Sequence, residues 1–363
     1  MSVISKEAVE AAIKGYKEPH LGRDLVAAHA VKSIDIEGDA VRVAVELGFP
    51  AKGIQQAIAD AVKDCVMGVS GVGSAQVDVS WEIKAHSVQK SLKPIDNVKN
   101  IIAVASGKGG VGKSTTAVNL ALALAAEGAR VGLLDADIYG PSQPRMLGID
   151  GKPESKDGST LEPMSSYDLQ AMSIGFLIDE ETPMIWRGPM VTQALEQLLK
   201  DTNWSDLDYL VIDLPPGTGD TQLTLAQKVP VSGALIVTTP QDIALLDARK
   251  GLKMFQKVEV PVLGIVENMS IHICSKCGHE EHIFGQGGGT AMSEQYGVDL
   301  LGSLPLDIQI REETDNGKPT VVAQPDSRIT EIYREIARKT AAKLSLQAKD
   351  YAAKFPRIVI ENN

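Results

Sequence analysis

The chain has 363 residues, a formal net charge of −11 at pH 7, 44% hydrophobic residues and 23% charged residues. This composition is typical of a folded globular protein and excludes a chain that is disordered throughout. The acidic balance disfavours binding to nucleic-acid backbones and to negatively charged membranes, and an aromatic fraction of 4% disfavours a base-stacking platform.

Cysteine usage and the N-terminus predict where the protein works. Three cysteines are too few for a disulfide framework and indicate a reducing compartment. The first residues, MSVISKEAVEAAIKGY, contain no apolar stretch of signal-peptide length, and no run of about 18 apolar residues predicts a membrane helix. We therefore expect a cytoplasmic protein with no nucleic-acid or membrane partner.

Residues 1–84 predict a small α/β domain with the order helix, two strands, helix, strand. Helices are indicated by apolar residues at helical spacing, and strands by alternation of apolar and polar residues. The five segments are 5–16, 31–36, 40–46, 54–66 and 76–83. Residues 85–97 are polar without a clear period and are expected to be a linker.

From Val98 onwards, short apolar runs alternate with helical stretches. This alternation predicts a doubly wound, mostly parallel α/β sheet over residues 98–363. The expected buried strands are Ile101–Ala105, Arg130–Leu134, Tyr209–Ile212, Gly233–Thr238 and Val262–Val266. Helices are expected over Thr116–Glu127, Met190–Lys200 and residues 326–354.

A phosphate-binding loop follows the first of these strands. The segment Gly107–Ser114 satisfies the pattern G-x-x-x-x-G-K-[ST] and precedes a helix, so it predicts a P-loop NTPase fold. Lys113 is expected to reach the β- and γ-phosphates of ATP, and Ser114 to hold Mg²⁺. The expected nucleotide-binding residues of the loop are Gly107, Gly109, Gly110, Val111, Gly112, Lys113, Ser114 and Thr115.

Acidic residues end two of the predicted strands. Asp135 and Asp137 follow one apolar run, and Asp213 follows another. Carboxylates at the C-terminal ends of parallel strands lie where open α/β sheets bind ligands. Asp213 suits the role of holding Mg²⁺ through water, although each of these aspartates could instead cap a turn.

Cys274 and Cys277 form a C-x-x-C pair within MSIHICSKCGHEEHIFGQGGG. Two thiolates at this spacing can share a metal or cluster, or form a redox disulfide. The redox motif usually opens a helix in a thioredoxin-like unit, whereas Gly278 and polar residues follow here. Metal or cluster binding is therefore favoured, and three nearby histidines remain open as ligands: His272, His279 and His282.

The chain resembles the Mrp/ApbC-type iron–sulfur cluster carrier ATPases, a P-loop family with a deviant Walker A motif. Five segments carry the resemblance, in the family's order, between about residues 98 and 290: SGKGGVGKST, DADIYGPS, WRGPM, DYLVIDLPPGTGD and CSKCGHEEHIFGQGGG. The resemblance implies a homodimer that bridges a labile [4Fe–4S] cluster and transfers it to apo-proteins, coupled to ATP binding and hydrolysis. Residues 1–84 are similar to a small domain related to iron–sulfur assembly factors, often fused in front of bacterial members.

The resemblance also implies roles for single residues. Lys108 would cross the dimer interface to the partner's nucleotide, and Asp137 would orient the attacking water. Asp135 would support the Mg²⁺ shell, and Asn268 would read the adenine edge. The expected catalytic residues are therefore Lys108, Lys113 and Asp137.

The expected cluster ligands follow from a count of thiolates. A [4Fe–4S] cluster typically takes four, and one chain offers only two at suitable spacing. A two-fold dimer would present four, so Cys274 and Cys277 of both chains are expected to bind it, with cluster scaffold proteins as further partners. Two other functions stay open: a partition or cell-division ATPase, which does not need the C-x-x-C pair, and a zinc-stabilised nucleotide-binding scaffold.

Overall fold

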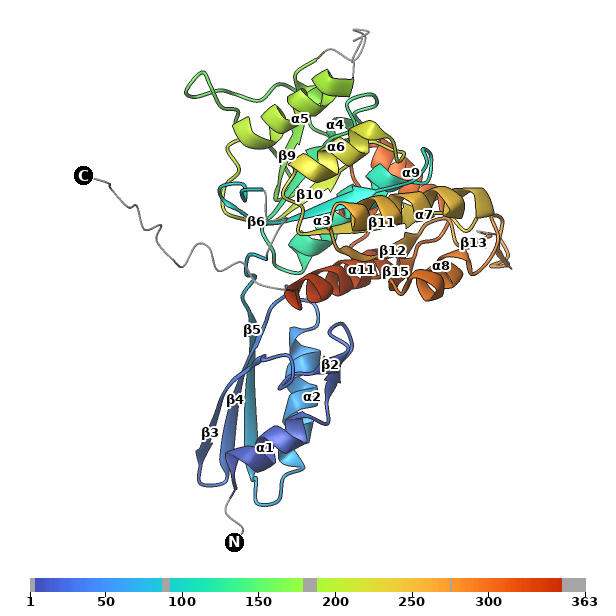
Figure 1. Cartoon of the computed structure of the whole chain (residues 1–363). Helices are drawn as coiled ribbons and strands as arrows, with labels where there is room; N and C mark the ends of the chain where they lie inside the picture. Colours follow the sequence, from blue (N-terminus) through green and yellow to red (C-terminus); the bar gives the residue numbers. More distant parts are fainter. Residues whose placement is uncertain (1–3, 87–91, 179–187, 275, 348–363) are drawn as a thin grey trace, which may run out of the picture.

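The computed structural model describes residues 4–86, 92–178, 188–274 and 276–347. Figure 1 shows two parts, a smaller one built from the first strands and helices and a larger one built around a wide sheet. We call residues 4–86 the N-terminal unit and residues 98–347 the P-loop unit. None of the helices in these described ranges is both long enough and apolar enough to cross a membrane.

The N-terminal unit is a three-stranded sheet of order β3-β4-β5 packed against two helices. Strand β4 pairs antiparallel with β3 and parallel with β5. Its alternate residues Val41, Val43, Val45 and Leu47 are buried, as the alternation in sequence predicts. The elements are α1 (Lys6–Ile13), β1 (Lys17–Glu18), β2 (Arg23–Asp24), β3 (Val31–Glu37), β4 (Ala40–Leu47), α2 (Gln55–Met67) and β5 (Ser74–Trp81). The short pair β1 and β2 was not predicted.

An eight-stranded sheet forms the P-loop unit, with the order β15-β12-β11-β6-β10-β7-β9-β8. All neighbouring strands are parallel except β8, which is antiparallel to β9. This arrangement confirms the predicted doubly wound P-loop fold. The strands are β6 (Val98–Ala105), β7 (Val131–Asp135), β8 (Met164–Ser166), β9 (Leu169–Ser173), β10 (Leu207–Asp213), β11 (Gly233–Thr238), β12 (Val262–Glu267) and β15 (Leu300–Ser303).

Helices cover both faces of this sheet, so every residue of the central strands β10 and β11 is buried. One layer contains α3 (Lys113–Ala126), α10 (Thr320–Ala323) and α11 (Arg328–Ser345), which pack together. The other layer contains α5 (Gly188–Asp201), α6 (Asp220–Lys228), α7 (Asp242–Lys257) and α8 (Gly288–Tyr296). The shorter elements are α4 (Gln143–Met146), η1 (Ile174–Phe176), β13 (His272–Ile273), β14 (Glu280–Glu281) and α9 (Ile308–Asp315).

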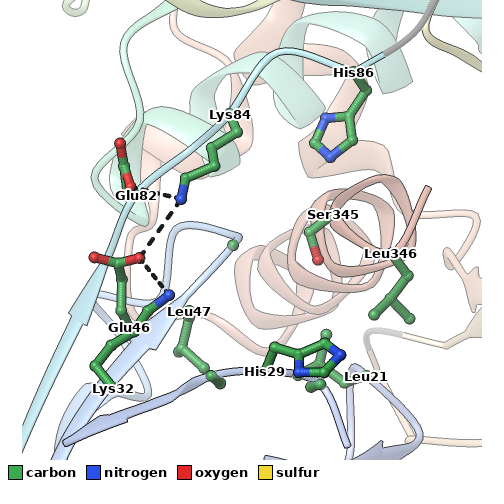
Figure 2. A pocket seen from close by; sticks show the side chains of 13 residues that line it. Leu21, His29, Lys32, Glu46, Leu47, Glu82, Lys84, His86, Ser345 and Leu346 are labelled. Carbon is green, nitrogen blue, oxygen red and sulfur yellow. Dashed lines mark ion pairs between the residues drawn. The ribbon is translucent and has the colours of Figure 1, made fainter. Parts of the chain in front are cut away.

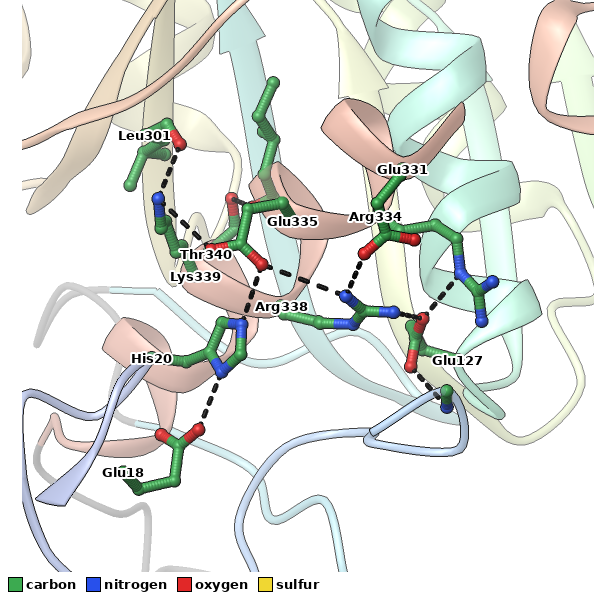
Figure 3. A network of polar contacts seen from close by, with 12 residues as sticks. Glu18, His20, Glu127, Leu301, Glu331, Arg334, Glu335, Arg338, Lys339 and Thr340 are labelled. Carbon is green, nitrogen blue, oxygen red and sulfur yellow. Dashed lines mark hydrogen bonds and ion pairs between the residues drawn. The ribbon is translucent and has the colours of Figure 1, made fainter. Parts of the chain in front are cut away.

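Glu127 joins the two units at the C-terminal end of α3 (Figure 3). Its fully buried Oε1 accepts hydrogen bonds from Arg334 Nε and Arg338 Nη2, both at 2.7 Å. The backbone N–H of Gly53, in the N-terminal unit, donates to Oε2 at 2.8 Å. Burial alone would raise the pKa of Glu127, but the hydrogen bonds from Arg338 and Gly53 hold that pKa below its usual range. The helix that starts at the P-loop therefore ends in a buried contact with the N-terminal unit.

His20 provides a second link between the units (Figure 3). Its Nδ1 lies 2.6 Å from Oε1 of the buried Glu18, and its Nε2 lies 2.8 Å from Oε2 of Glu335 on α11. Burial lowers the pKa of His20, but the two carboxylates outweigh it and raise the pKa to about 9. At neutral pH the imidazolium therefore bridges one carboxylate of each unit.

A small cavity of about 60 Å³ also lies between the units (Figure 2). Lys32 and Lys84 form ion pairs with Glu46 beside it, at 3.0 and 3.9 Å. These side chains are substantially exposed, and ion pairs of this kind contribute about 0–1 kcal/mol. Both ion pairs lie within the N-terminal unit, whereas the buried contacts of Glu127 and His20 cross from one unit to the other.

Candidate functional site

The P-loop connects β6 to α3 and curves around open space. Gly110 and Gly112 have φ of +80° and +81°, a backbone conformation that favours glycine. A Cβ at Gly112 would clash with the Asn268 amide, whereas a Cβ at Gly109 would meet nothing within 4 Å. The loop is therefore packed on one side and open on the other, which leaves room for a phosphate at the N-terminus of α3.

Lys113 brings the acidic strand ends to the phosphate loop. Its side chain is 6% exposed, and Nζ forms an ion pair with Asp213 Oδ1. Nζ also lies 3.1 Å from Ser114 Oγ and 3.9 Å from Asp137 Oδ2. The structure therefore gathers three of the predicted site residues around the ammonium group of a fourth, Lys113.

Asp135 is fully buried and holds the loop that follows β7. Its Oδ1 accepts the N–H of Asp137 at 3.1 Å, and its Oδ2 accepts the N–H of Ser142 at 3.0 Å and Ser173 Oγ–H at 3.1 Å. Burial and the neighbouring Asp213 raise the pKa of Asp135 to about 7. Its oxygens are engaged with the chain's own donors, so its support of a Mg²⁺ shell stays a prediction and would act through this loop.

Two further predicted residues lie in contrasting surroundings. Asn268 is buried, and its Nδ2 donates to the Val111 carbonyl oxygen at 2.9 Å. This contact supports the P-loop from behind, while adenine recognition stays a prediction. Lys108 is exposed and forms no ion pair with any residue in the described ranges. An unpaired lysine at the mouth of the loop suits contact with a second molecule, and that role also stays a prediction. Thr115 is half-buried in the first turn of α3.

Gln143 is a site residue that sequence reasoning missed. It is 2% exposed, and its Nε2 donates to Asp213 Oδ2 at 2.9 Å. The residue lies eight positions after the end of β7, in a segment without periodicity. Its position shortly after Asp135 was the only hint in the sequence that Gln143 belongs to the site. That hint is weak, because glutamine is mostly found at the surface.

The two cysteines lie at the tip of the short hairpin formed by β13 and β14. The N–H of Cys274 donates to the His279 carbonyl at 2.9 Å, and the N–H of Gly278 donates to the Cys274 carbonyl at 2.8 Å. Cys274 is half-buried and Cys277 is exposed. Backbone N–H groups of Lys276 and Cys277 lower the pKa of the Cys274 thiol, which favours the thiolate form that binds metals.

The histidines near the cysteines have other partners. His272 Nδ1 lies 3.1 Å from the Leu306 carbonyl, and His282 Nδ1 lies 2.9 Å from the Ser270 carbonyl. His279 is exposed, with Nε2 3.7 Å from Glu281 Oε1. Within the described ranges, no three His, Cys, Asp or Glu side chains lie close enough to hold a metal ion together. Trp186 and Arg187 of the WRGPM segment lie outside the described residues.

Comparison with known families gives two matches that together span most of the chain. Residues 97–341 match the ParA family model described as NUBPL iron-transfer P-loop NTPase. Residues 6–79 match a family model described as iron-sulfur cluster assembly protein.

Among relatives, the chain is 62% identical to an iron-sulfur cluster carrier protein of Pseudomonas fragi. The aligned region has 274 residues and covers 75% of this chain and 96% of the relative. The chain is 50% identical over 350 residues to the carrier protein of Escherichia coli K12, covering 95% of each. A nucleotide-binding protein of Archaeoglobus fulgidus, solved with ADP, is 37% identical with a TM-score of 0.57, covering 64% of this chain and 90% of that one. The cell division ATPase MinD of Pyrococcus furiosus shares the fold at 24% identity and a TM-score of 0.50, covering 66% of this chain and 97% of that one. The resemblance read from the sequence is thereby confirmed, and the chain belongs to the NUBPL-type iron-transfer family of P-loop NTPases.

Proposed function

We propose that this protein is a cytoplasmic iron–sulfur cluster carrier that holds a labile [4Fe–4S] cluster between two copies of the chain and transfers it to apo-proteins, with transfer coupled to ATP binding and hydrolysis. One observation carries the proposal: each chain presents a phosphate site together with a hairpin that carries two thiols at its tip, one of them exposed. Carrier names among relatives at 50% and 62% identity support it.

ATP chemistry is supported by the residues around Lys113. The β- and γ-phosphates would draw Lys113 away from Asp213, which would leave that carboxylate beside the Ser114 hydroxyl. Hydroxyl and carboxylate oxygens are the donors that Mg²⁺ prefers, so the residues present fit this ion. When bound, Mg²⁺ would neutralise phosphate charge. Asp137 would orient the attacking water, and Lys108 would contact the nucleotide of the partner subunit.

The cluster is cargo, and its ligands would come from two chains. Cys274 and Cys277 of one chain supply half of the four thiolates that the cluster typically takes. A two-fold axis beside the hairpin would supply the other half. The exposure of Cys277 suits a cluster that is received from scaffold proteins and passed on to apo-proteins.

We also propose that residues 1–84 are a separate domain, joined by residues 85–97 as linker to the P-loop ATPase domain of residues 98–363. Its match to iron–sulfur assembly proteins supports a role in partner contact. The family assignment favours a carrier over a partition ATPase or a zinc-stabilised scaffold.

Anaerobic reconstitution with iron and sulfide tests the proposal. We expect about four iron atoms per two chains in the wild type. Cys274→Ser and Cys277→Ser should each lose the cluster while ATP binding stays intact. Cys65→Ser is the matched control, because Cys65 lies on α2 in the N-terminal unit, and this variant should keep the cluster. Zinc without sulfide, or a complete cluster in a monomer, would contradict the proposal.

A further inference from the structure

Gln143 links three elements of the nucleotide site. Its side-chain Nε2 donates to Asp213 Oδ2 at 2.9 Å and to the Ser114 carbonyl oxygen at 3.1 Å. Its backbone N–H donates to Asp135 Oδ2 at 3.1 Å. One buried residue therefore contacts the ends of β7 and β10 and the first turn of α3.

The neighbours of the amide determine its orientation. A carboxylate oxygen and a carbonyl oxygen are both acceptors, so the end of the amide that faces them must be the NH₂ group. The other end, Oε1, is buried and has no hydrogen-bond partner among the residues that the structure describes. Burying an acceptor without a donor is unfavourable, so this oxygen is available to a donor that enters with the ligand.

Asp213 depends on Gln143 once ATP arrives. Its carboxylate is fully buried, with one oxygen paired to Lys113 and the other held by Gln143. When Lys113 turns to the phosphates, the Gln143 amide is the side-chain donor that still holds the carboxylate. Without it, the carboxylate could rotate or turn toward its neighbours.

We propose that Gln143 is a positioning residue of the nucleotide site: its amide orients the Asp213 carboxylate for Mg²⁺-bound ATP, and its backbone N–H bonds to Asp135, which holds the loop that carries Asp137. This inference rests on the proposed ATP hydrolysis. A glutamine suits the position because it orients the carboxylate without neutralising its charge. Outer-shell partners of this kind typically change metal affinity by about 10- to 100-fold when removed.

Gln143→Met tests the role with little change in side-chain volume. A fluorescent ATP analogue is titrated first in EDTA and then with increasing Mg²⁺, and hydrolysis is measured at each Mg²⁺ concentration. We expect an unchanged affinity in EDTA, and about a 10-fold or larger increase in the Mg²⁺ concentration that gives half-maximal binding and hydrolysis. Gln143→Asn keeps an amide but is one methylene shorter, so it should move the Mg²⁺ dependence in the same direction. It serves as the second variant if methionine prevents folding.

Gln170→Met is the matched control, because Gln170 bonds to Ser205 at 2.8 and 2.9 Å, away from the acidic strand ends, and it should leave the Mg²⁺ dependence unchanged. If folded Gln143 variants show the wild-type Mg²⁺ dependence, the positioning role is wrong. If they lose affinity equally in EDTA and in Mg²⁺, Gln143 only supports the loop and the inference is again wrong. Absence of Mg²⁺-dependent hydrolysis in the wild type would instead count against the proposed function.

Discussion

Removing the positive charge of His20 should destabilise the docked N-terminal unit, with a defined pH dependence. Contacts with Glu18 and Glu335 raise the pKa of His20 from 6.5 to about 9. At about 1.4 kcal/mol for each tenfold change in proton affinity, this rise corresponds to roughly 3 kcal/mol of folding free energy. The imidazole is 8% exposed and Glu18 is fully buried, so solvent screens that pair little, whereas Glu335 is 36% exposed and its pair is screened more, which makes about 3 kcal/mol an upper figure.

The sign of the effect follows from the direction of the shift. Because the folded pKa is raised, the stabilisation is complete below about pH 6.5 and is lost as the pH rises through about 9. His20→Gln keeps hydrogen-bonding capacity but carries no charge. The unfolding free energy of wild type minus variant should therefore be up to about 3 kcal/mol near pH 6 and close to zero above about pH 9.5.

Urea unfolding followed by circular dichroism and tryptophan fluorescence measures this difference. Other groups titrate in the same window, and comparing wild type with variant at each pH removes their contribution. His29→Asn is the matched control, because His29 is exposed and has φ of +56°, which asparagine tolerates. A difference between wild type and His20→Gln that stays constant across the window would refute the reasoning.

Three further outcomes can be measured directly. Lys113→Ala should abolish ATP turnover, because the β- and γ-phosphates lose the ammonium group that would neutralise their charge. A near-normal steady-state rate would contradict the P-loop assignment. Lys108→Ala should keep nucleotide binding and lose hydrolysis when equilibrium binding is measured beside turnover, whereas lost binding would point to a role in the fold instead. Gly53→Ala should lower the unfolding free energy by about 1–3 kcal/mol, because its Cβ would clash with the buried contacts of Glu127. An unchanged urea midpoint would contradict this prediction and show that the side chains around Gly53 can move to accommodate a methyl group.

Local patterns were sufficient to predict the P-loop, the acidic strand ends and five of the parallel strands, but not β9 (Leu169–Ser173), which is parallel to β7 and mostly buried. A glycine-rich motif and a continuous apolar run each depend on neighbours in sequence, so they are visible without tertiary structure. The edge strands β8 (Met164–Ser166) and β15 (Leu300–Ser303) were missed because they are short and each is paired on one side. Short strands at a sheet edge lack the long apolar run that marks a central strand.

The junction between the units could not be predicted for a different reason. Glu127 and His20 are polar residues that sequence statistics place at the surface. Their burial depends on Arg334, Arg338 and Glu335, which lie more than two hundred positions away. Gln143 is the same kind of case, because its partner Asp213 lies 70 positions away. Pairings at such separation are set by the folded topology and leave no local pattern.

Charge balance explains why a neutral residue at position 143 suits this site. Asp135, Asp137 and Asp213 lie around one cation, Lys113. Burial, and after it the charge of Asp213, raise the pKa of Asp137 despite the nearby lysine. ATP would add further negative charge, and a divalent cation would offset the repulsion between its phosphates and these carboxylates. A second lysine at position 143 would neutralise Asp213 permanently and compete with that cation. The Gln143 amide orients the carboxylate and leaves its charge available for a metal that would accompany the nucleotide.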